Sequence, residues 1–470
     1  MYKKTKRAKT VRNFCADGTL TKSILLTSLP IAGQNLISFS SSFIDSLMVA
    51  PLGAEAVGGV YAGSEIQRLL RYFLIGAEAA VLIAGSVAIG KKNRREAVKI
   101  GVWGILIASA VAVLAALVSF FFSEKILSLF STEAKIREAG ALYLKISALS
   151  FPVFCLSESL VCADRCLGGK GAGPVSSGVA LAVGLVLDIG LIGGRLGLPA
   201  LGVKGAALSS VVARGAQLLS VFIFFLVRAL ARRARKGSPA PNEDKPQGEK
   251  PSLLPFSSLR MLLRAAIPTV SAQLVWGFYM MLSAAIMTSL PSGAASAGVA
   301  SAAYNLAMAP TAGYTAALSM LSGRAKGEGN RERLYRLRAT AERLSPAIGL
   351  ITSLATAAIA RPLVCLYSGG RESLSSALPL LLVLILTLPL STYESPALYG
   401  LLRGAGEAPF VLKTDLIVLF GVVLPSAFLA KDLGVSAPLL YFILRSEAII
   451  KAAVAALRLR SSIRPVDSGG

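Results

Sequence analysis

The 470-residue sequence contains no histidine. This absence excludes histidine general bases, Ser-His arrangements, HExxH zinc sites and histidine proton relays, so any coupling to a proton or cation must use carboxylates. The sequence also has no G-x-x-x-x-G-K-[ST] phosphate loop, which argues against ATP-driven pumping. Because no metal-ligand cluster or nucleophile elbow is present either, we do not expect an enzyme.

Cysteine is scarce as well. The five cysteines are an odd number and lie mostly inside apolar segments, so they predict no disulfide framework. Cys155, Cys162 and Cys166 share one helix face, and small hydrophobic residues of a membrane helix explain that pattern without a thiolate metal site. We expect no metal and no organic cofactor.

Long apolar runs are the main feature of the sequence. Hydrophobic residues make up 54% of the chain, the mean hydropathy is +0.65, and runs of 18 or more recur along it. Barrel strands need only about 9–11 alternating residues, so these runs predict an all-α polytopic membrane protein. The twelve predicted transmembrane helices are 23–49, 58–89, 99–122, 140–163, 175–195, 203–228, 260–290, 297–322, 341–361, 375–401, 410–430 and 436–457.

The net charge of +24 is distributed in a way that indicates topology rather than nucleic-acid binding. Lysine and arginine gather in alternate breaks between the apolar runs, as in KKNRRE (91–96) and in 323–338, whereas 51–56 and 291–295 carry few. This is the pattern of cytoplasmic loops, so both termini are expected in the cytoplasm. The basic N-terminus precedes a run of spanning length, which favours an uncleaved first helix over a signal peptide.

The chain reads as two copies of one unit. We expect a cytoplasmic tail (1–22), a six-helix bundle (23–228), a linker (229–259), a second six-helix bundle (260–458) and a cytoplasmic tail (459–470). The linker is rich in Pro, Gly and charge and predicts a mobile connector. Three pairs align the bundles at offsets of 236–238 residues: Pro30 with Pro268, Gly90 with Gly327, and Glu158-Ser159 with Glu394-Ser395. With six spans per copy, the bundles share one orientation about a pseudo-two-fold axis along the membrane normal, a frame typical of alternating access.

The first predicted helix carries a polar stripe, which is unusual for a spanning segment. Its polar residues fall on one face at about 3.6 residues per turn; they are Gln34, Ser38, Ser41 and Asp45. A charge in a spanning helix costs about 2.5–3.5 kcal/mol on the insertion scale, so such residues normally face a bundle interior or a watery cavity. Pro30 removes one backbone hydrogen bond beside the stripe and is either a hinge or a static kink.

Helix direction and depth predict where the acids meet. Asp45 in the first span, Asp188 in the fifth and Ser210 in the sixth fall at similar depth in the outer half of the first bundle. Two carboxylates in low dielectric do not both stay ionised without a partner, so either a proton is taken up or a cation binds between them. The alternative is that each aspartate pairs separately with Arg214, Lys204 or a backbone group.

Other polar residues of the spans are candidates for the cleft or for ion pairs. Glu65 and Arg68 are spaced to neutralise one another. Asp415 and Glu447 are expected to pair with Lys413, Arg445 or Lys451. The candidates for lining a cleft and contacting substrate are Gln34, Ser38, Arg71, Glu78, Glu158, Gln273, Asn305 and Glu394. Glu158 and Glu394 are equally compatible with caps near loop backbone.

Three stretches resemble the multidrug and toxic compound extrusion (MATE) transporters of the flippase-related superfamily. FIDSLMVAPLGAEAVGGV (43–60) is similar to the family's first-helix pattern, and LVLDIGLIGG with LGVKGAALSS (185–210) to its fifth and sixth helices. GLLRGAGEAP (400–409) is close to the pattern that follows its tenth helix. The resemblance covers nearly the whole chain outside the tails and the linker.

The resemblance implies that Asp45 and Asp188 are the paired carboxylates that bind a proton or sodium ion, and that Ser210 stands where a threonine often helps to coordinate it. Gly184 replaces the usual asparagine one turn before Asp188, which favours protons over sodium. Trp276 stands near the position of a glutamate in one branch of the family, which assigns coupling to the N-terminal bundle. Ile189 replaces a common proline.

Two functions remain open from the sequence. The first is a cation-coupled antiporter of the plasma membrane, driven by protons or sodium ions, that exports amphipathic organic compounds or drugs. The second is a flippase for lipid-linked saccharides or other anionic lipids, suggested by Arg68, Arg71 and the basic cytoplasmic loops. Expected partners are a small amphipathic substrate and membrane lipids, without nucleic acid, and a monomer is expected.

Overall fold

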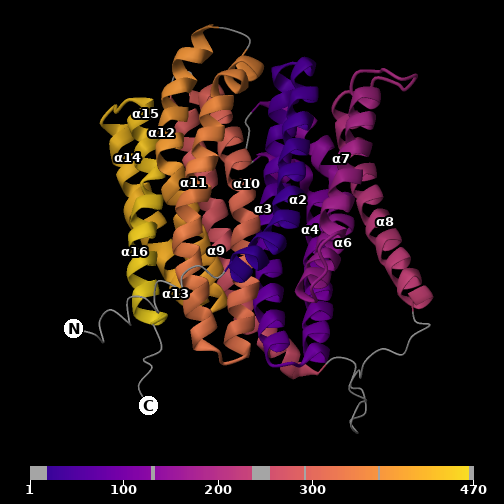
Figure 1. The fold of residues 1–470 in the computed structure, drawn as a ribbon. Coiled ribbons are helices and arrows are strands. Elements are labelled where there is room, and N and C mark those ends of the chain that lie inside the picture. Colours follow the sequence, from indigo (N-terminus) through magenta and orange to yellow (C-terminus); the bar gives the residue numbers. More distant parts are fainter. Residues whose placement is uncertain (1–17, 129–132, 236–254, 291–292, 369–370, 465–470) are drawn as a thin grey trace, which may run out of the picture. The chain divides into compact units, whose positions relative to one another are not determined.

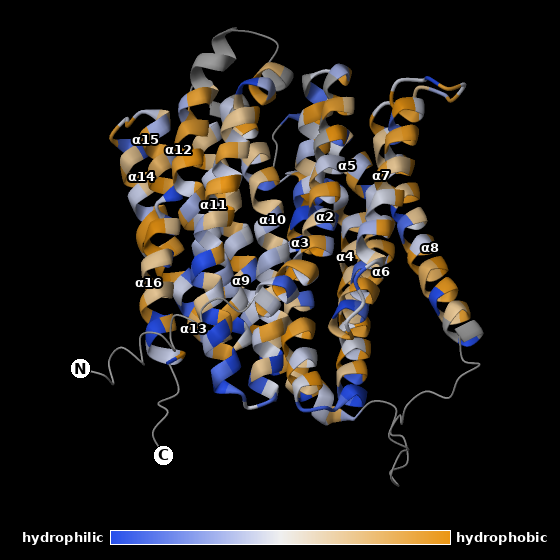
Figure 2. Ribbon diagram, in the orientation of Figure 1, coloured by the Kyte–Doolittle hydropathy of each residue, from blue (hydrophilic) through white to orange (hydrophobic). Residues whose placement is uncertain are grey.

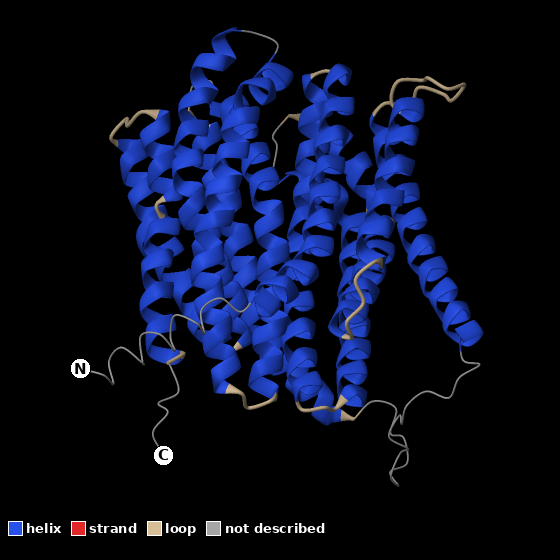
Figure 3. Cartoon of the chain, viewed as in Figure 1, coloured by secondary structure: helices blue, strands red, loops and turns tan. Residues whose placement is uncertain are grey.

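The computed structural model describes residues 18–128, 133–235, 255–290, 293–368 and 371–464. Most of the predicted N-terminal tail, the middle of the linker and the end of the C-terminal tail lie outside these residues. Within them the chain forms helices joined by loops, with no strand (Figure 3).

Figure 1 shows the helices, which follow the predicted spans. Their bounds are α2 (Gly18–Val49), η1 (Ala50–Leu52), α3 (Ala54–Gly90), α4 (Arg94–Ser128), α5 (Ala134–Ser147), α6 (Ser150–Cys166), α7 (Ala172–Leu191), α8 (Val203–Arg235), α9 (Phe256–Thr288), α10 (Gly293–Gly327), α11 (Arg331–Ser368), α12 (Arg371–Ser395), η2 (Pro396–Leu402), α13 (Ala408–Asp415), η3 (Leu416–Val423), α14 (Leu424–Asp432), α15 (Ala437–Arg445) and α16 (Glu447–Ser462). Every predicted span overlaps at least one of them. Eight helices of the described residues are long and apolar enough to cross a membrane, or nine if the bent pair α5–α6 is one span.

Two predicted boundaries were wrong, each for a local reason. The span predicted at 140–163 is broken between α5 and α6, which meet at an angle of 48°. Pro152 lacks the N–H that would bond to Ala148, and this missing bond coincides with the break. The span predicted at 175–195 ends at Leu191 because Gly193 and Gly194 follow, the latter with a φ of +67°. Asp188 therefore lies in the last turn of α7.

Two late spans contain π-helical segments, which sequence patterns did not predict. The segment η2 begins at Pro396, whose missing N–H disrupts the regular ladder of hydrogen bonds. The segment η3 follows directly after Asp415. Such segments are frequent at functional sites because they shift side chains relative to a regular helix.

The chain divides into two compact units. Unit 1 comprises residues up to Phe39, Ile75–Asn93 and Ala265–Gly470, and unit 2 comprises Ser40–Leu74 and Arg94–Arg264. This division cuts through α2 and α3, so the first part of α2 and the last part of α3 belong to the unit that contains the C-terminal helices. The two bundles predicted at 23–228 and 260–458 stay a prediction.

Within unit 1, close contacts obey the predicted two-fold relation. A Cβ added at Gly76 of α3 would lie 2.6 Å from Cα of Val270 in α9, and one added at Gly313 of α10 would lie 2.5 Å from N of Ala32 in α2. Gly76 and Gly313 are 237 residues apart, and Ala32 and Val270 are 238 apart. The second span of each copy thus packs on the first span of the other through an equivalent glycine.

The equivalent glycines at the ends of these helices meet each other. A Cβ at Gly90 would lie 2.2 Å from the carbonyl oxygen of Arg324, and one at Gly327 would lie 2.2 Å from that of Val87. Each added Cβ would also lie within 3.0 Å of the other glycine's Cα. Reciprocal contact between equivalent residues is the property of a two-fold axis. Only residues without a side chain allow these backbones to approach so closely.

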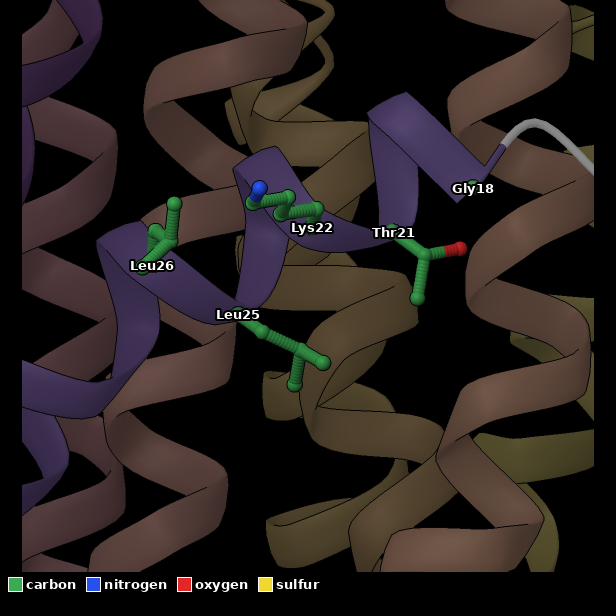
Figure 4. A pocket seen from close by; sticks show the side chains of 5 residues that line it. All are labelled: Gly18, Thr21, Lys22, Leu25 and Leu26. Atoms are coloured by element: carbon green, nitrogen blue, oxygen red, sulfur yellow. The ribbon is translucent and has the colours of Figure 1, made fainter.

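Hydrophobic residues cover most of the helix length, while hydrophilic residues gather at the turn between α10 and α11 (Figure 2). A shallow hollow of about 490 Å³ lies on the first turns of α2, lined by Gly18, Thr21, Lys22, Leu25 and Leu26 (Figure 4). A similar hollow lies on the start of α9, which is the repeat-equivalent helix. Neither contains a predicted site residue, so neither is our candidate site.

Candidate functional site

Unit 2 brings together the two acids that sequence depth predicts to meet. The side chains of Asp45 in α2 and Asp188 in α7 are hydrogen-bonded to each other. Asp188 is buried, with 4% of its surface exposed, and Asp45 is partly buried. Two carboxyl groups that contact each other do not both stay ionised without a partner, so this contact suits a pair that shares a proton.

Hydroxyl groups surround the pair. Ser209 of α8 hydrogen-bonds to the Asp188 side chain, and its Oγ also lies 3.2 Å from the carbonyl oxygen of Gly184. Ser210, the predicted ligand, donates to the carbonyl oxygen of Ala206 at 3.1 Å and hydrogen-bonds with Tyr143 of α5. The structure therefore places Ser209 on Asp188 and Ser210 toward Tyr143.

Arg214 of α8 connects the pair with Glu158. Its guanidinium lies 4.3 Å from the ring centroid of Phe154 in α6, and its Nη1 donates to Oε1 of Gln217 at 3.0 Å. Nε2 of Gln217 in turn donates to Oε1 of Glu158 at 2.6 Å. Arg214 also interacts electrostatically with Asp45. A polar chain therefore runs from the aspartate pair to a glutamate on a different helix.

The arginines of α3 divide into two kinds. Arg68 forms an ion pair with Glu65 at 3.2 Å, which confirms the predicted neutralisation, and stacks over Tyr61 at 5.7 Å. Arg71 lies close enough to Arg214 for the two positive charges to repel each other. Unit 2 thus holds two neighbouring cations, of which Arg214 interacts with Asp45.

Unit 1 contains a second buried acidic cluster, which holds its own cation. Nζ of Lys451 lies 2.8 Å from Oδ1 of Asp415 and 3.6 Å from Oε2 of Glu447, and the three side chains are at most 1% exposed. The hydroxyl of Tyr399 donates to Oδ1 of Asp415 at 2.7 Å. The prediction that Asp415 and Glu447 form ion pairs is confirmed, with Lys451 as the shared partner.

Aromatic rings and a second arginine enclose this cluster. Lys451 lies 4.6 Å from the ring centroid of Trp276 in α9. Arg445 lies 3.6 Å from Glu447, 4.2 Å from the ring of Tyr304, and donates to Ser391 at 2.9 Å. Glu394, a predicted cleft residue, is 4% exposed and interacts electrostatically with this cluster. It lies inside a packed charge network.

The remaining predicted cleft residues all belong to unit 1 and lie outside the aspartate pair. They are Gln34 and Ser38 of α2, Glu78 of α3, Gln273 of α9 and Asn305 of α10. Gln34 is buried, with 3% of its surface exposed, and the others are partly buried. Pro30 lies inside α2, which continues through it, and its role as a hinge stays a prediction.

Sequence reasoning missed three residues of unit 2. Tyr143, Ser209 and Gln217 all contact predicted site residues. Gln217 lies one turn after Arg214 on α8, and a buried amide in an apolar span is a signal that could have pointed to it. Tyr143 and Ser209 offer no such signal because tyrosine and serine are ordinary residues of membrane helices.

Comparisons with known proteins agree with this architecture. The family model described as MatE matches residues 30–189 and 268–429. The two matches begin at Pro30 and Pro268, the pair that aligns the two copies.

Curated relatives cover most of the chain. A "Probable multidrug resistance protein NorM" of Thermotoga maritima is 24% identical over 421 residues, which are 87% of this chain and 85% of the relative. Another from Pasteurella multocida is 22% identical over 88% of this chain and 87% of its own length.

Solved structures share the fold. The MATE transporter VcmN of Vibrio cholerae superposes with a TM-score of 0.80 at 20% identity, covering 95% of this chain and 98% of the other. A transporter of the MOP superfamily from Pyrococcus furiosus superposes with a TM-score of 0.79 at 17% identity, covering 94% and 95%. The predicted fold class, an all-α polytopic membrane protein with twelve transmembrane helices, is confirmed.

Proposed function

The chain belongs to the MATE family of membrane transporters, and from that premise we propose that it exports amphipathic organic cations in exchange for protons that enter through the Asp45–Asp188 pair. Members of this family are transporters and not enzymes. The observation that carries the proposal is the hydrogen bond between the two carboxyl groups in unit 2. The curated relatives named as multidrug resistance proteins support an organic cargo.

Protons suit this pair better than sodium ions. A sodium ion needs several oxygen ligands, and Gly184 offers only its backbone carbonyl, which already accepts a hydrogen bond from Ser209. A sodium ion would also bring a second positive charge next to Arg214, whereas a proton neutralises a carboxylate and adds no separate ion. Both arguments favour proton coupling.

In a transporter that works by alternating access, the close glycine contacts of unit 1 would hold helix ends together on the cytoplasmic side. Gly90 and Gly327 precede the two basic turns that positive charge places in the cytoplasm. The backbone contact between them closes the cytoplasmic end of α3 against α10. In alternating access, opening of this end would require these contacts to separate.

The same charge pattern supports a multi-pass protein of the plasma membrane with both termini in the cytoplasm. Ile24 near the start of α2 and Leu459 near the end of α16 belong to one hydrophobic cluster, so these two helix ends lie at the same end of unit 1. A monomer interacting with membrane lipids is the simplest assembly, because each copy of the repeat supplies one half of the transporter.

Asp45→Asn and Asp188→Asn test the proposal. Proteoliposomes holding the full chain are loaded with ethidium, and the outside is acidified to drive export. One pH unit supplies about 1.4 kcal/mol per proton. We expect the wild type to respond to the proton gradient and not to an equal sodium gradient. Each aspartate variant should lose the response by about a hundredfold, equal to about 2.7 kcal/mol.

Glu55→Gln is the matched control, because Glu55 is an exposed acid of the same unit that pairs with Lys135 at 2.9 Å. It should transport like the wild type. Wild-type, gradient-driven export by either aspartate variant would refute the proposed site. A response to sodium but not to protons would refute proton coupling while leaving the site in place.

A second candidate is flipping of anionic lipids, and the specific observation in its favour is that Arg71 neighbours Arg214 in unit 2. The MOP superfamily transporter from Pyrococcus furiosus has a binding pocket of reverse polarity, which suggests a different function for that protein. A panel of dyes and lipid-linked saccharides separates the two: lipid translocation without ethidium export would favour the flippase.

A further inference from the structure

Arg214 interacts with two acidic sites of unit 2. It interacts electrostatically with Asp45, which is hydrogen-bonded to Asp188. It also reaches Glu158 through Gln217, by hydrogen bonds of 3.0 and 2.6 Å. A guanidinium stays charged throughout the physiological pH range, so its attraction to each side changes only when an acid changes its charge.

The ring of Phe154 gives the guanidinium a flat surface on which to slide. The centroid lies 4.3 Å from the Arg214 guanidinium carbon, and Phe154 is one helical turn before Glu158 on α6. Stacking keeps an arginine close to a ring without fixing its hydrogen-bond partner. The other groups that face Arg214 are Arg71, which repels it, and Tyr143.

We propose that Arg214 is a movable internal counter-ion that passes the protonation state of the Asp45–Asp188 pair to Glu158. When the pair is ionised, its charge draws Arg214 toward Asp45, and the arginine then competes less with an organic cation for Glu158. When the pair takes up a proton, the attraction weakens, and Arg214 returns through Gln217 to Glu158 and displaces the cation. The arrangement in the structure, with Arg214 linked through Gln217 to Glu158, corresponds to the second state.

This inference rests on the proposed function and adds its exchange step. The proton binds to the Asp45–Asp188 pair and the organic cation binds to Glu158, so the two do not compete for the same oxygen atoms. Their competition is indirect, because Arg214 interacts with both sites. Arg214 is a positioning residue, because it need not contact the cargo. The mechanism requires that cargo affinity depend on pH through Arg214, which a purely structural arginine would not produce.

The test measures binding of ethidium to the purified full chain by fluorescence anisotropy over a range of pH. For the wild type, acidification through the range in which the pair takes up a proton should raise the Kd by about tenfold or more. Arg214→Gln should bind ethidium with a Kd that changes less than about twofold over that range, because no arginine then competes with ethidium for Glu158. Arg214→Lys keeps the charge and should restore most of the pH dependence.

Two further variants complete the design. Glu158→Gln should bind ethidium weakly at every pH, and this result tests the proposal even where the arginine variants fold poorly. Arg228→Gln is the matched control, because Arg228 lies on the same helix and pairs with a different acid, Asp164, at 2.7 Å. It should keep the wild-type pH dependence.

The inference is overturned if Arg214→Gln keeps the wild-type pH dependence, or if Glu158→Gln binds ethidium as the wild type does. Either result would leave the proposed antiport intact provided that Asp45→Asn and Asp188→Asn still abolish gradient-driven export. Conversely, normal export by those two aspartate variants would refute the proposed function itself. The two failures are therefore distinguishable.

Discussion

The two units of the molecule bury acidic residues in opposite ways. In unit 2, Asp45 and Asp188 hydrogen-bond to one another, with hydroxyl groups and an arginine nearby. In unit 1, Asp415 and Glu447 share Lys451, which is fully buried with them. Because Lys451 is part of the chain, it cannot dissociate from the two acids as a bound ion can. It therefore permanently occupies the place that a cation from solution would take. Under the proposed function, unit 2 exchanges a proton, whereas the buried ion pairs of unit 1 maintain its structure.

The π-helical segments reinforce this difference. Tyr399 lies in η2, and Asp415 immediately precedes η3. Both residues contact Lys451, at 3.1 Å and 2.8 Å. The π-helical segments of unit 1 therefore contribute to a site around Lys451, whereas Asp45 and Asp188 of unit 2 lie on α-helical segments.

The largest expected change in folding stability follows from removing the positive charge of Lys451. Lys451→Met leaves Asp415 and Glu447 buried without their shared partner, which should cost about 3–5 kcal/mol of folding stability. A lowered thermal unfolding temperature of the purified protein would reveal this loss. Lys451→Met combined with Asp415→Asn should recover most of it, because the uncompensated charge is removed.

Lys413→Met is the control for that experiment, since Lys413 is exposed and lies two residues before Asp415. Its unfolding temperature should match the wild type. If Lys451→Met were as stable as the wild type, the cluster in unit 1 would not be a structural ion pair, and the contrast between the two units would disappear.

A smaller change in folding stability is expected in unit 2. Asp45→Asn removes one of the two acids that share a proton and keeps a group that can hydrogen-bond to Asp188, so folding stability should stay within about 1 kcal/mol of the wild type or rise. Stability should also depend less on pH, because the variant pair has one acid fewer to titrate. Thermal unfolding at several pH values measures both. A loss as large as that of Lys451→Met would show that Asp45 is a structural residue.

Depth along a helix could be predicted from the sequence far better than rotation about its axis. Asp45 and Asp188 meet because alternating helix direction and a fixed rise of about 1.5 Å per residue set their level in the bundle. The choice between Ser209 and Ser210 depends on a rotation of about 100°, and a helix that is apolar nearly all round does not fix that angle. The partner of Asp415 was open among three cations for the same reason.

Gly184→Asn should produce the smallest change of the variants considered, an increase in sodium-driven export. It tests most directly why the acids of unit 2 should take up a proton rather than a metal ion. A Cβ at Gly184 would lie 3.6 Å from Cβ of Ala213, an ordinary contact, so the side chain has room to start. The introduced amide would lie one turn before Asp188 on the same face of α7 and would add an oxygen ligand to the pair. Since sodium needs such ligands and a proton does not, sodium-driven ethidium export should rise by about three- to tenfold, equal to about 0.6–1.4 kcal/mol, while proton-driven export stays near the wild-type rate.

Gly178→Ala is the control for a change in α7 itself, because no atom lies within 4 Å of a Cβ added at that position. If Gly184→Asn responds to sodium no better than this control, a missing ligand is not what excludes the metal ion. The positive charge of Arg214 would then be the stronger barrier, and the double variant with Arg214→Gln should be the first to respond to sodium.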